Sequence, residues 1–319
     1  MRKNECRICG NSQNNTPYTI KEMMYGLKDD FDYFQCSNCE CLQINETPSD
    51  LEKYYPARYY SFTPFNEKKY QGINGLVKKT KFSSVIFAQT AFQKLLKKLF
   101  FKNHVLNELI ISKESRILDV GSGNGAKFLY PLAKLGFLHV LGCDPFLENS
   151  IHYENGLKIK KADIFQIEGK WDIITFHHSF EHTSNPVQIM QKVSSLLAEQ
   201  GTCMIRIPTV SSFAWQHYQA HWFQLDAPRH LYLHSTRSME ILAEKAGLEI
   251  VKIVYDSNYK QFEESEKYKR DIALRTPRPR GISNFIKRKI RKAKYRKKAA
   301  QLNEQKRGDQ AAFFLQKIS

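Results

Sequence analysis

The sequence predicts an α/β protein with a mainly parallel central sheet, preceded by a small cysteine-rich module and interrupted by a basic helical insertion. Residues 113–258 alternate short β-rich runs with helical patterns, which is typical of a parallel sheet covered by helices. The first β-rich run leads directly into alternate glycines, and five of the seven cysteines fall within the first 41 residues. These observations define the class of fold before any function is considered.

Six strands and three helices are expected in the α/β region. The strands are predicted at Arg116–Val120, Val140–Asp144, Leu157–Lys161, Trp171–His177, Thr202–Pro208 and Glu249–Tyr255. The helices are predicted at Ala126–Leu135, Pro186–Ala198 and Thr236–Ala246. Gly136 and Gly247 follow two of these helices, at the position where a left-handed residue commonly ends a helix.

The chain divides into five predicted segments. They are a cysteine module at 1–45, a helical connector at 46–112, the α/β domain at 113–258, a basic helical insertion at 259–307 and a final strand at 308–319. In the connector, apolar residues at helical spacing between lysines predict a basic helical stretch from Val85 to Leu109. The apolar run near the end predicts a closing strand, which would place the basic segment between the last two strands.

Composition excludes several classes of protein. No run of 18 or more apolar residues occurs, so no transmembrane helix is expected. No apolar stretch follows the first charged residues, which predicts no secretory signal and a cytoplasmic protein. An odd number of cysteines, seven, argues against a disulfide framework.

The segment from Ile117 to Gly125 carries the strongest chemical signal. An apolar strand runs into Gly121, Gly123 and Gly125, and a helix is expected to follow. Glycines let the backbone turn sharply and approach a ligand, and a helix start offers free N–H groups. The spacing also fits a dinucleotide-binding loop. Two features favour S-adenosylmethionine instead. Asp119 can accept a hydrogen bond from a ligand ammonium group, and a third glycine is present at Gly125.

Acidic residues follow the next two predicted strands. Asp144, followed by Pro145, ends the second strand and suits the hydroxyls of a ribose. Asp163, followed by Ile164, ends the third strand and suits the amino group of adenine. The competing interpretation is a plain glycine turn with two surface acids, which a constellation in the correct strand order disfavours.

Residues 113–258 resemble the class I S-adenosylmethionine-dependent methyltransferases. The resemblance implies a Rossmann-like sheet of seven strands with the last one antiparallel. It implies that the glycine loop, including Ser122 and Asn124, faces the methionine part of the cofactor. It further implies that Asp144 holds the ribose, that Asp163 and Ile164 hold the adenine, and that the loop beginning with His177 and His178 closes over the cofactor.

Two C-x-x-C pairs near the N-terminus predict a zinc module. Cys6 and Cys9 form the first pair, Cys36 and Cys39 form the second, and 26 residues separate the pairs. Two such pairs supply four thiolates, which suit a structural tetrahedral zinc site without an open position. A redox role is the alternative, and Cys41 either replaces Cys39 or stays free.

The order of these parts resembles sugar-modifying methyltransferases of bacterial polysaccharide and deoxysugar pathways. The further stretches that carry this resemblance are Tyr54-Tyr55-Pro56, Gly142-x-Asp144-Pro145-Phe146 and Asp226-x-Pro228-Arg229-His230. The resemblance implies an acceptor that is a sugar, a sugar nucleotide or a lipid-linked glycan, with O-methylation as the expected reaction.

Residues after the fourth predicted strand are candidates for catalysis. Glu181 and His182 can act as a base or as an orienting pair. A metal site that includes His178 is the competing interpretation, because the segment resembles the E-x-x-E-H site of some quinone-pathway O-methyltransferases. Capping of the next helix is the structural alternative. The stretch lacks the D/N-P-P-Y sequence typical of amino-group methylation on bases.

A second cluster follows the fifth predicted strand. His230 is the further catalytic candidate, and Trp222, Asp226 and Arg229 are the substrate-binding candidates. An aromatic ring can stack on a sugar, and a guanidinium can bind a phosphate. The alternative is a packed lid with Trp222 in the core.

Most of the net charge of +17 lies in the basic insertion, where residues 266–307 hold 17 Lys and Arg against 3 acids. Residues 282–298 predict a basic amphipathic helix suited to an anionic membrane surface, and it equally suits RNA through phosphate contacts. A solvated face without a partner is the remaining alternative. The leading hypothesis is therefore a methyltransferase at the inner membrane face, acting on a sugar or glycolipid. The alternatives are an RNA-modifying methyltransferase and a binding module without catalysis.

Overall fold

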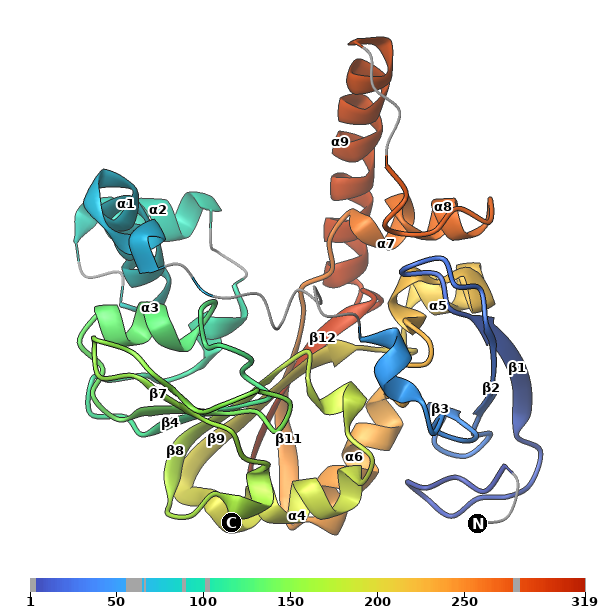
Figure 1. The fold of residues 1–319 in the computed structure, drawn as a ribbon, viewed down its shortest axis with the longest axis horizontal. Helices are drawn as coiled ribbons and strands as arrows, with labels where there is room; N and C mark the ends of the chain where they lie inside the picture. Colours follow the sequence, from blue (N-terminus) through green and yellow to red (C-terminus); the bar gives the residue numbers. More distant parts are fainter. Residues whose placement is uncertain are drawn as a thin grey trace.

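The computed structural model describes residues 4–55, 65, 67–87, 90–100, 104–277 and 282–318. Its centre is an eight-stranded sheet in the order β11-β12-β9-β8-β4-β5-β7-β6 (Figure 1). The strands in chain order are β4 (Ile117–Val120), β5 (Val140–Cys143), β6 (Ile151–His152), β7 (Lys158–Lys160), β8 (Trp171–His177), β9 (Leu197–Pro208), β11 (Leu248–Tyr255) and β12 (Gln310–Lys317).

The pairing of these strands confirms the predicted fold class. β7, β5, β4, β8 and β9 run parallel, whereas β12 lies antiparallel between β9 and β11. β6 adds a two-residue antiparallel edge beside β7. Parallel strands bring their carboxyl ends to one edge of a sheet, and ligands bind there in open α/β folds.

The helices of the α/β domain are shorter than predicted. They are α3 (Leu129–Lys134), α4 (Pro186–Leu196), α5 (Phe213–Tyr218) and α6 (Thr236–Lys245). α3 begins at Leu129, not at Ala126, because the glycine loop continues as turns in which Ala126 N–H donates to the Asn124 side chain. β9 begins at Leu197, not at Thr202, because Leu197 already pairs with Trp171 across a bulge.

The helical stretch predicted from Val85 to Leu109 is divided into shorter elements in the structure. The structure has α1 (Gly72–Ile86), α2 (Ala91–Phe100) and the 3-10 turn η3 (Val105–Glu108). A second helix starts because Thr90 and Gln93 exchange side-chain and backbone hydrogen bonds, both 3.1 Å, in the manner of a capping box. The two helices lie above α3, as Figure 1 shows.

The N-terminal region forms a small antiparallel sheet in the order β1-β2-β3-β10. Its strands are β1 (Thr16–Lys21), β2 (Asp30–Gln35), β3 (Leu42–Ile44) and β10 (Tyr232–Leu233). β10 comes from the chain that follows β9, so the cysteine module and the α/β domain share a sheet. Their buried side chains also form one continuous cluster, which includes Tyr33 and Trp222.

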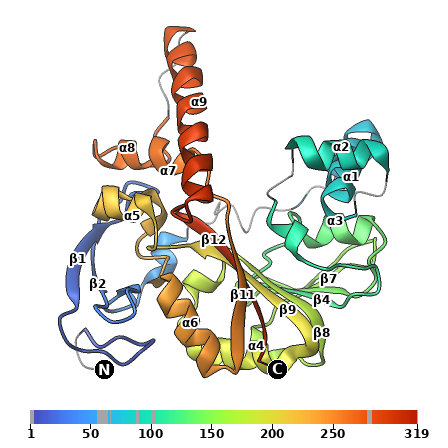
Figure 2. The same cartoon turned by 180° about the vertical axis from the view of Figure 1, so that it is seen from behind.

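The segment between β11 and β12 contains α7 (Lys260–Glu263), α8 (Ser265–Tyr268) and the long α9 (Ile282–Glu304). The C-terminal half of α9 packs on the body through Ala299 and Leu302, both buried, while the rest projects away from the sheet (Figures 1 and 2). Among the described residues, no helix is both long and apolar enough to cross a membrane. Short 3-10 turns complete the fold at η1 (Leu51–Tyr54), η2 (Glu67–Tyr70), η4 (Ile164–Gln166), η5 (Phe180–His182), η6 (Gln219–His221) and η7 (Phe223–Leu225).

Candidate functional site

The loop after β4 makes a tight turn at the carboxyl edge of the sheet. Gly121, Gly123 and Gly125 have φ values of +69°, +54° and +69°, which residues with a Cβ rarely adopt. A Cβ at Gly121 would also collide with the side chain of Ser179, which closes over the loop from the end of β8. The sequence needs glycine at these positions because the backbone conformation and the packing both require it.

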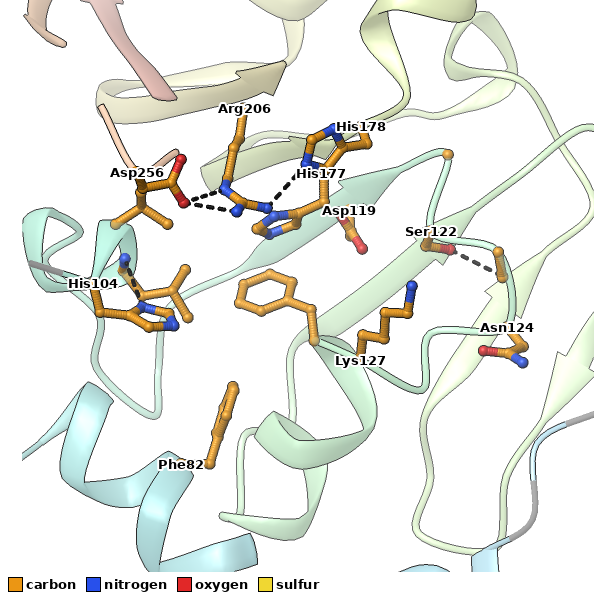
Figure 3. Close-up of a pocket in the computed structure, with 15 residues that line it drawn as sticks. Phe82, His104, Asp119, Ser122, Asn124, Lys127, His177, His178, Arg206 and Asp256 are labelled. Atoms are coloured by element: carbon orange, nitrogen blue, oxygen red, sulfur yellow. Dashed lines mark hydrogen bonds and ion pairs between the residues drawn. The ribbon is translucent and has the colours of Figure 1, made fainter. Parts of the chain in front are cut away.

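A cavity of about 390 Å³ lies beside this loop (Figure 3). Its walls come from the glycine loop, the ends of β8 and β9, the start of the segment after β11, and the connector. The lining residues are Phe82, His104, Val105, Leu106, Asp119, Gly121, Ser122, Gly123, Asn124, Lys127, Phe128, His177, His178, Arg206 and Asp256. The sequence candidates Asp119, His177 and His178 are therefore brought together with the glycine loop.

Two buried polar groups face this cavity. The Asp119 carboxyl accepts a 2.7 Å hydrogen bond from Thr175 Oγ1, and burial raises its pKa to about 7 in spite of that bond. The His177 ring packs at a tilt against Phe128, with the ring centroids 4.8 Å apart, and burial lowers its pKa to about 3. Its Nε2 atom is buried and has no hydrogen-bond partner in the described part of the chain. Both groups are placed to meet polar atoms of a ligand.

The two acids predicted to hold the nucleoside lie outside the lining of this cavity. The Asp144 carboxylate, before Pro145, accepts from the N–H groups of Gly123 and Phe146, each at 2.9 Å. Asp163 caps η4, whose first residue Ile164 is buried. Asp144 therefore fixes the glycine loop from the end of β5, and Asp163 fixes the turn after β7.

A chain of polar contacts that the sequence analysis missed crosses the cavity. The Arg206 guanidinium forms an ion pair with Asp256 at 2.7 Å, and its NH1 group donates to His178 Nε2 at 3.1 Å (Figure 3). His178 Nδ1 in turn lies 3.3 Å from Glu181 Oε1. A lone arginine inside the apolar strand that ends at Pro208 is the signal that could have revealed Arg206.

The three catalytic candidates lie together just beyond this chain. The ligand atoms of Glu181, His182 and His230 lie within 4.8 Å of one another, and the two imidazole rings are 4.7 Å apart. Burial opposes ionisation of Glu181, but the hydrogen bond from His178 and the nearby imidazoles outweigh it and lower its pKa to about 2. Burial also lowers the pKa of His230, to about 4. The cluster therefore combines a carboxylate with a neutral imidazole at neutral pH.

The substrate-binding roles predicted for Trp222 and Arg229 do not fit the structure, whereas that of Asp226, whose side chain is 13% exposed, stays a prediction. Trp222 is fully buried, and its indole N–H donates to Asp309 at 3.1 Å. Arg229 is also fully buried, between Glu22 at 2.8 Å and Asp226 at 2.7 Å. Arg229 holds the cysteine module against the domain, and Trp222 holds the start of the last strand, so neither side chain is exposed to a substrate.

The four paired cysteines converge as predicted. Cys6 Sγ lies 3.5 Å from Cys39 Sγ, Cys9 Sγ lies 3.5 Å from Cys36 Sγ, and all four sulfurs lie within 4.8 Å of one another. Sulfurs at tetrahedral positions about 2.3 Å from zinc are about 3.8 Å apart, so the cluster fits this metal.

The two cysteine loops also share one backbone pattern. In each loop the N–H group four residues after the first cysteine donates to the carbonyl of that cysteine, at 2.8 Å for Gly10 and 2.9 Å for Glu40. Gly10 and Glu40 both have a positive φ. Cys41 is buried outside the cluster, with its sulfur 3.9 Å from His234 Nδ1, so it does not replace Cys39 in this arrangement.

The strand order, the glycine loop and the cavity at the carboxyl edge of the sheet define a Rossmann-like fold of the class I methyltransferase type. The family pattern described as a methyltransferase domain matches residues 87–253. The chain belongs to this methyltransferase-domain family. No curated protein matches the sequence.

Several solved structures are similar to the chain at low identity. Magnesium protoporphyrin IX methyltransferase from Synechocystis PCC 6803 is 19% identical over 44% of this chain and 62% of its own, with a TM-score of 0.32. A putative S-adenosylmethionine dependent methyltransferase from Listeria monocytogenes is 13% identical over 68% and 97%, with a TM-score of 0.43. Mycolic acid cyclopropane synthase CmaA1 is 16% identical over 73% and 88%, with a TM-score of 0.42. This chain thus spans less than two thirds of the first of these proteins.

Proposed function

We propose that the protein binds S-adenosylmethionine beside the glycine loop and transfers its methyl group to a hydroxyl of a sugar, sugar nucleotide or lipid-linked glycan. The observation that carries the proposal is the cavity between the glycine loop and the polar chain of His178, Arg206 and Asp256. The wall formed by the glycine loop offers backbone N–H groups and the carboxyl group of Asp119. The opposite wall offers the guanidinium of Arg206.

The residues present fit the methionine part of the cofactor. Asp119 uses one oxygen for Thr175, and its other oxygen can accept from an ammonium group. The buried His177 Nε2, without a partner among the described residues, is the kind of atom that a bound ligand satisfies. The cavity volume of about 390 Å³ lies within the usual range for small-molecule sites.

Asp144 and Asp163 keep their proposed roles toward the nucleoside. A carboxylate oxygen accepts more than one hydrogen bond, so Asp144 can hold a ribose hydroxyl while it still accepts from Gly123. Pro145 is exposed and would supply apolar surface beside the adenosine, whereas Ile164 is buried beneath the turn after β7. Under this proposal the cofactor extends from the cavity over the ends of β5 and β7.

Methyl transfer forms a carbon–oxygen bond to the acceptor and breaks the carbon–sulfur bond of the sulfonium, while the hydroxyl proton is lost. The protein must align the acceptor oxygen with the methyl group and favour loss of this proton. Glu181, His182 and His230 are proposed to serve the second task, because they lie together and Glu181 contacts His178, which lines the cavity. The sulfonium charge disappears in the step, so a dry site favours it.

The charge of the cavity wall supports an acceptor that carries a phosphate or a carboxylate. Arg206 lies on the wall opposite the glycine loop, where it pairs with Asp256, and Lys127 lies beside the glycine loop. Burial lowers the pKa of His104, a further basic residue of the lining, so this imidazole adds no full charge at neutral pH. A guanidinium is well suited to bind an anionic oxygen in a partly dry site. Sugar nucleotides and lipid-linked glycans both contain such groups.

The surface supports a membrane-bound acceptor. The projecting half of α9 exposes Phe285 and Ile290, 57% and 68% accessible, among lysines and arginines. α2 exposes Phe92 and Leu95 beside Lys94 and Lys98. Both projections extend to the same side of the molecule in Figures 1 and 2. Basic residues with apolar anchors are typical of surfaces that bind anionic lipids.

RNA is the second candidate acceptor, because the same basic helix can contact phosphates. Binding to RNA would depend steeply on salt and would be lost on charge reversal of Lys292 and Arg296. Phosphate contacts do not use exposed aliphatic side chains such as Ile286 and Ile290, and for this reason we favour the lipid surface.

The function is tested by incubating the protein with methyl-labelled S-adenosylmethionine and an extract of the source cell. Label in a nucleotide-sugar or glycolipid fraction is the expected result. Label confined to RNA would transfer the proposal to the second candidate. Cofactor binding without label in any fraction, even with an enriched glycolipid pool, would contradict catalysis on this acceptor class.

A further inference from the structure

A second cluster of metal-ligand side chains, far from the cysteines in sequence, lies next to His178, which lines the cavity. Glu181 and His182 come from η5, directly after β8, and His230 comes from the segment before β10. One ligand atom from each lies within 4.8 Å of the others. Two separate segments therefore bring two imidazoles and one carboxylate to a single point.

The backbone fixes which nitrogen of each imidazole carries the proton. His182 Nδ1 lies 2.8 Å from the carbonyl oxygen of Arg229, and His230 Nδ1 lies 2.8 Å from the carbonyl oxygen of Gln224. A carbonyl only accepts, so both Nδ1 atoms donate. Both Nε2 atoms then present a lone pair, which is the tautomer that second-shell carbonyls impose on metal-binding histidines.

The lone pair of His230 faces carboxylates across gaps that no hydrogen bond fills. His230 Nε2 lies 3.9 Å from Glu181 Oε1 and 3.8 Å from Asp226 Oδ2. A lone pair turned toward two anionic groups is unfavourable unless a cation lies between them. A metal ion about 2.0–2.2 Å from each atom fits between two ligands separated by these distances.

Glu181 provides the independent observation. Its side chain is fully buried, and within the described ranges its Oε2 atom has no hydrogen-bond partner, while Oε1 lies 3.3 Å from His178 Nδ1. A buried polar atom without a partner is the kind of group that a bound ligand or ion satisfies. Oε2 is therefore an atom that a cation in the cluster would satisfy.

We propose that Glu181, His182 and His230, assisted by Asp226, bind a divalent transition-metal ion such as Mn²⁺, Fe²⁺, Co²⁺ or Zn²⁺. Two imidazoles and a carboxylate form a ligand set that these ions accept with further positions open. His182 is only partly buried, so the open positions face the exposed side of the cluster.

This role deepens the proposed function and, for catalysis, rests on it. A hydroxyl bound to a divalent cation loses its proton more readily, in the same way as metal-bound water. The acceptor proton would pass to water as the carbon–oxygen bond forms and the carbon–sulfur bond breaks. The metal ion would thereby take the place of a general base, and no residue of the cluster would need to accept the proton.

The test is a titration of the purified full-length protein, with its cysteine zinc retained, by Mn²⁺ alone. Electron paramagnetic resonance reports the free ion, and elemental analysis reports zinc. The expected result is one Mn²⁺ bound per chain. Glu181→Gln and the partly exposed His182→Gln are expected to weaken binding by about 100-fold or more. The exposed His221, changed to Gln, is the matched control and is expected to bind Mn²⁺ normally.

Circular dichroism on each variant shows whether it is folded, and only folded variants are compared. If the folded parent protein takes up neither Mn²⁺ nor Co²⁺, and no zinc beyond that of the cysteines, the metal site is refuted. Binding is measured without the cofactor, so this failure leaves the proposed function standing. Methyl transfer that is unchanged after the bound Mn²⁺ is removed would refute the role of the metal in catalysis only.

Discussion

Two arginine networks of the molecule use the same chemistry in different surroundings. Arg229 is fully buried and pairs with Glu22 and Asp226, and its NH1 group also donates to the carbonyl of Tyr54 at 2.9 Å. Arg206 pairs with Asp256 and contacts His178, but its side chain is 24% exposed on the cavity wall. The first network joins the cysteine module to the domain, whereas the second faces the space where ligands bind.

The difference shows that burial, more than residue type, assigns the role. Glu22 accepts N–H groups from residues 24–27 as well as Arg229, so every acceptor position has a structural partner. Arg206 keeps an accessible side. A guanidinium with every donor committed inside the protein stabilises the fold, and one with an accessible edge can also recognise an anion.

Breaking the buried network should have the largest effect. Arg229→Met leaves the Glu22 and Asp226 carboxylates buried without their cation, so we expect a loss of about 3–5 kcal/mol in the free energy of unfolding. Denaturant titration of the parent and variant measures this loss. Arg237→Met is the control, because its pair with Glu240 is exposed and is worth less than about 1 kcal/mol. A loss for Arg229→Met no greater than that of the control would contradict the structural role.

Loss of zinc should loosen the cysteine module, which the Arg229 network joins to the α/β domain. Cys39→Ser takes one thiolate from the proposed zinc site, and structural zinc contributes directly to folding. We expect loss of the bound zinc and earlier proteolysis of the first 45 residues, with a smaller stability loss than for Arg229→Met because the α/β sheet keeps its own core. Cys203→Ser, which changes a buried cysteine outside the cluster, is the control for zinc content. Equal zinc in both variants would contradict the assignment.

Breaking the cavity network should affect activity more than stability. Arg206→Met keeps the length of the side chain but removes the contacts to Asp256 and His178, so we expect methyl transfer to fall by about 10- to 100-fold. The free energy of unfolding should change by about 1 kcal/mol or less, because the pair is partly solvated. Initial rates with saturating cofactor, together with denaturant titration, separate the two effects. A stability loss comparable to that of Arg229→Met would erase the distinction between the networks.

The glycine loop and the cysteine pairs were predictable because their meaning is local. Three glycines in one turn need positive φ values, and four cysteines in two short loops bring their own geometry. The motif around Asp226, Arg229 and His230 misled because its partners, Glu22 and Tyr33, lie about 200 positions earlier in the chain. Several polar residues close together in the sequence suggest a substrate site. Only the tertiary fold shows that Arg229 and His230 are buried against the cysteine module.

The catalytic candidates were predictable in part from local sequence, and in part only from the tertiary fold. Glu181 and His182 could be placed near the cofactor from their position after β8, since carboxyl ends of parallel strands meet at one edge. Their convergence with His230 depends on how the chain returns after β9, which no local pattern specifies. Asp256 and His104 reach the cavity in the same manner, from segments whose sequence gives no sign of a ligand.

The smallest expected effect concerns Asp119, which faces the cavity. The pH dependence of cofactor binding tests whether this carboxyl group contacts the cofactor. The pKa of its carboxyl is raised to about 7 by burial, so at pH 6 most of the protein carries a neutral Asp119. An ammonium group prefers the carboxylate, and binding must therefore expel the proton at low pH. We expect the affinity for S-adenosylmethionine to fall by up to about tenfold per pH unit below 7 and to be constant from pH 7.5 to 8.5.

Isothermal titration at pH 6, 7 and 8 measures this dependence, and two variants sharpen it. Asp119→Asn should bind weakly and with little dependence on pH, because it has no proton to lose. Thr175→Val removes the hydrogen bond that opposes the rise in pKa, so the fall in affinity should begin at a higher pH. A parent protein with the same affinity at pH 6 and pH 8 would show that Asp119 does not meet the ammonium group, and the cofactor would then have to lie against the Arg206 side of the cavity.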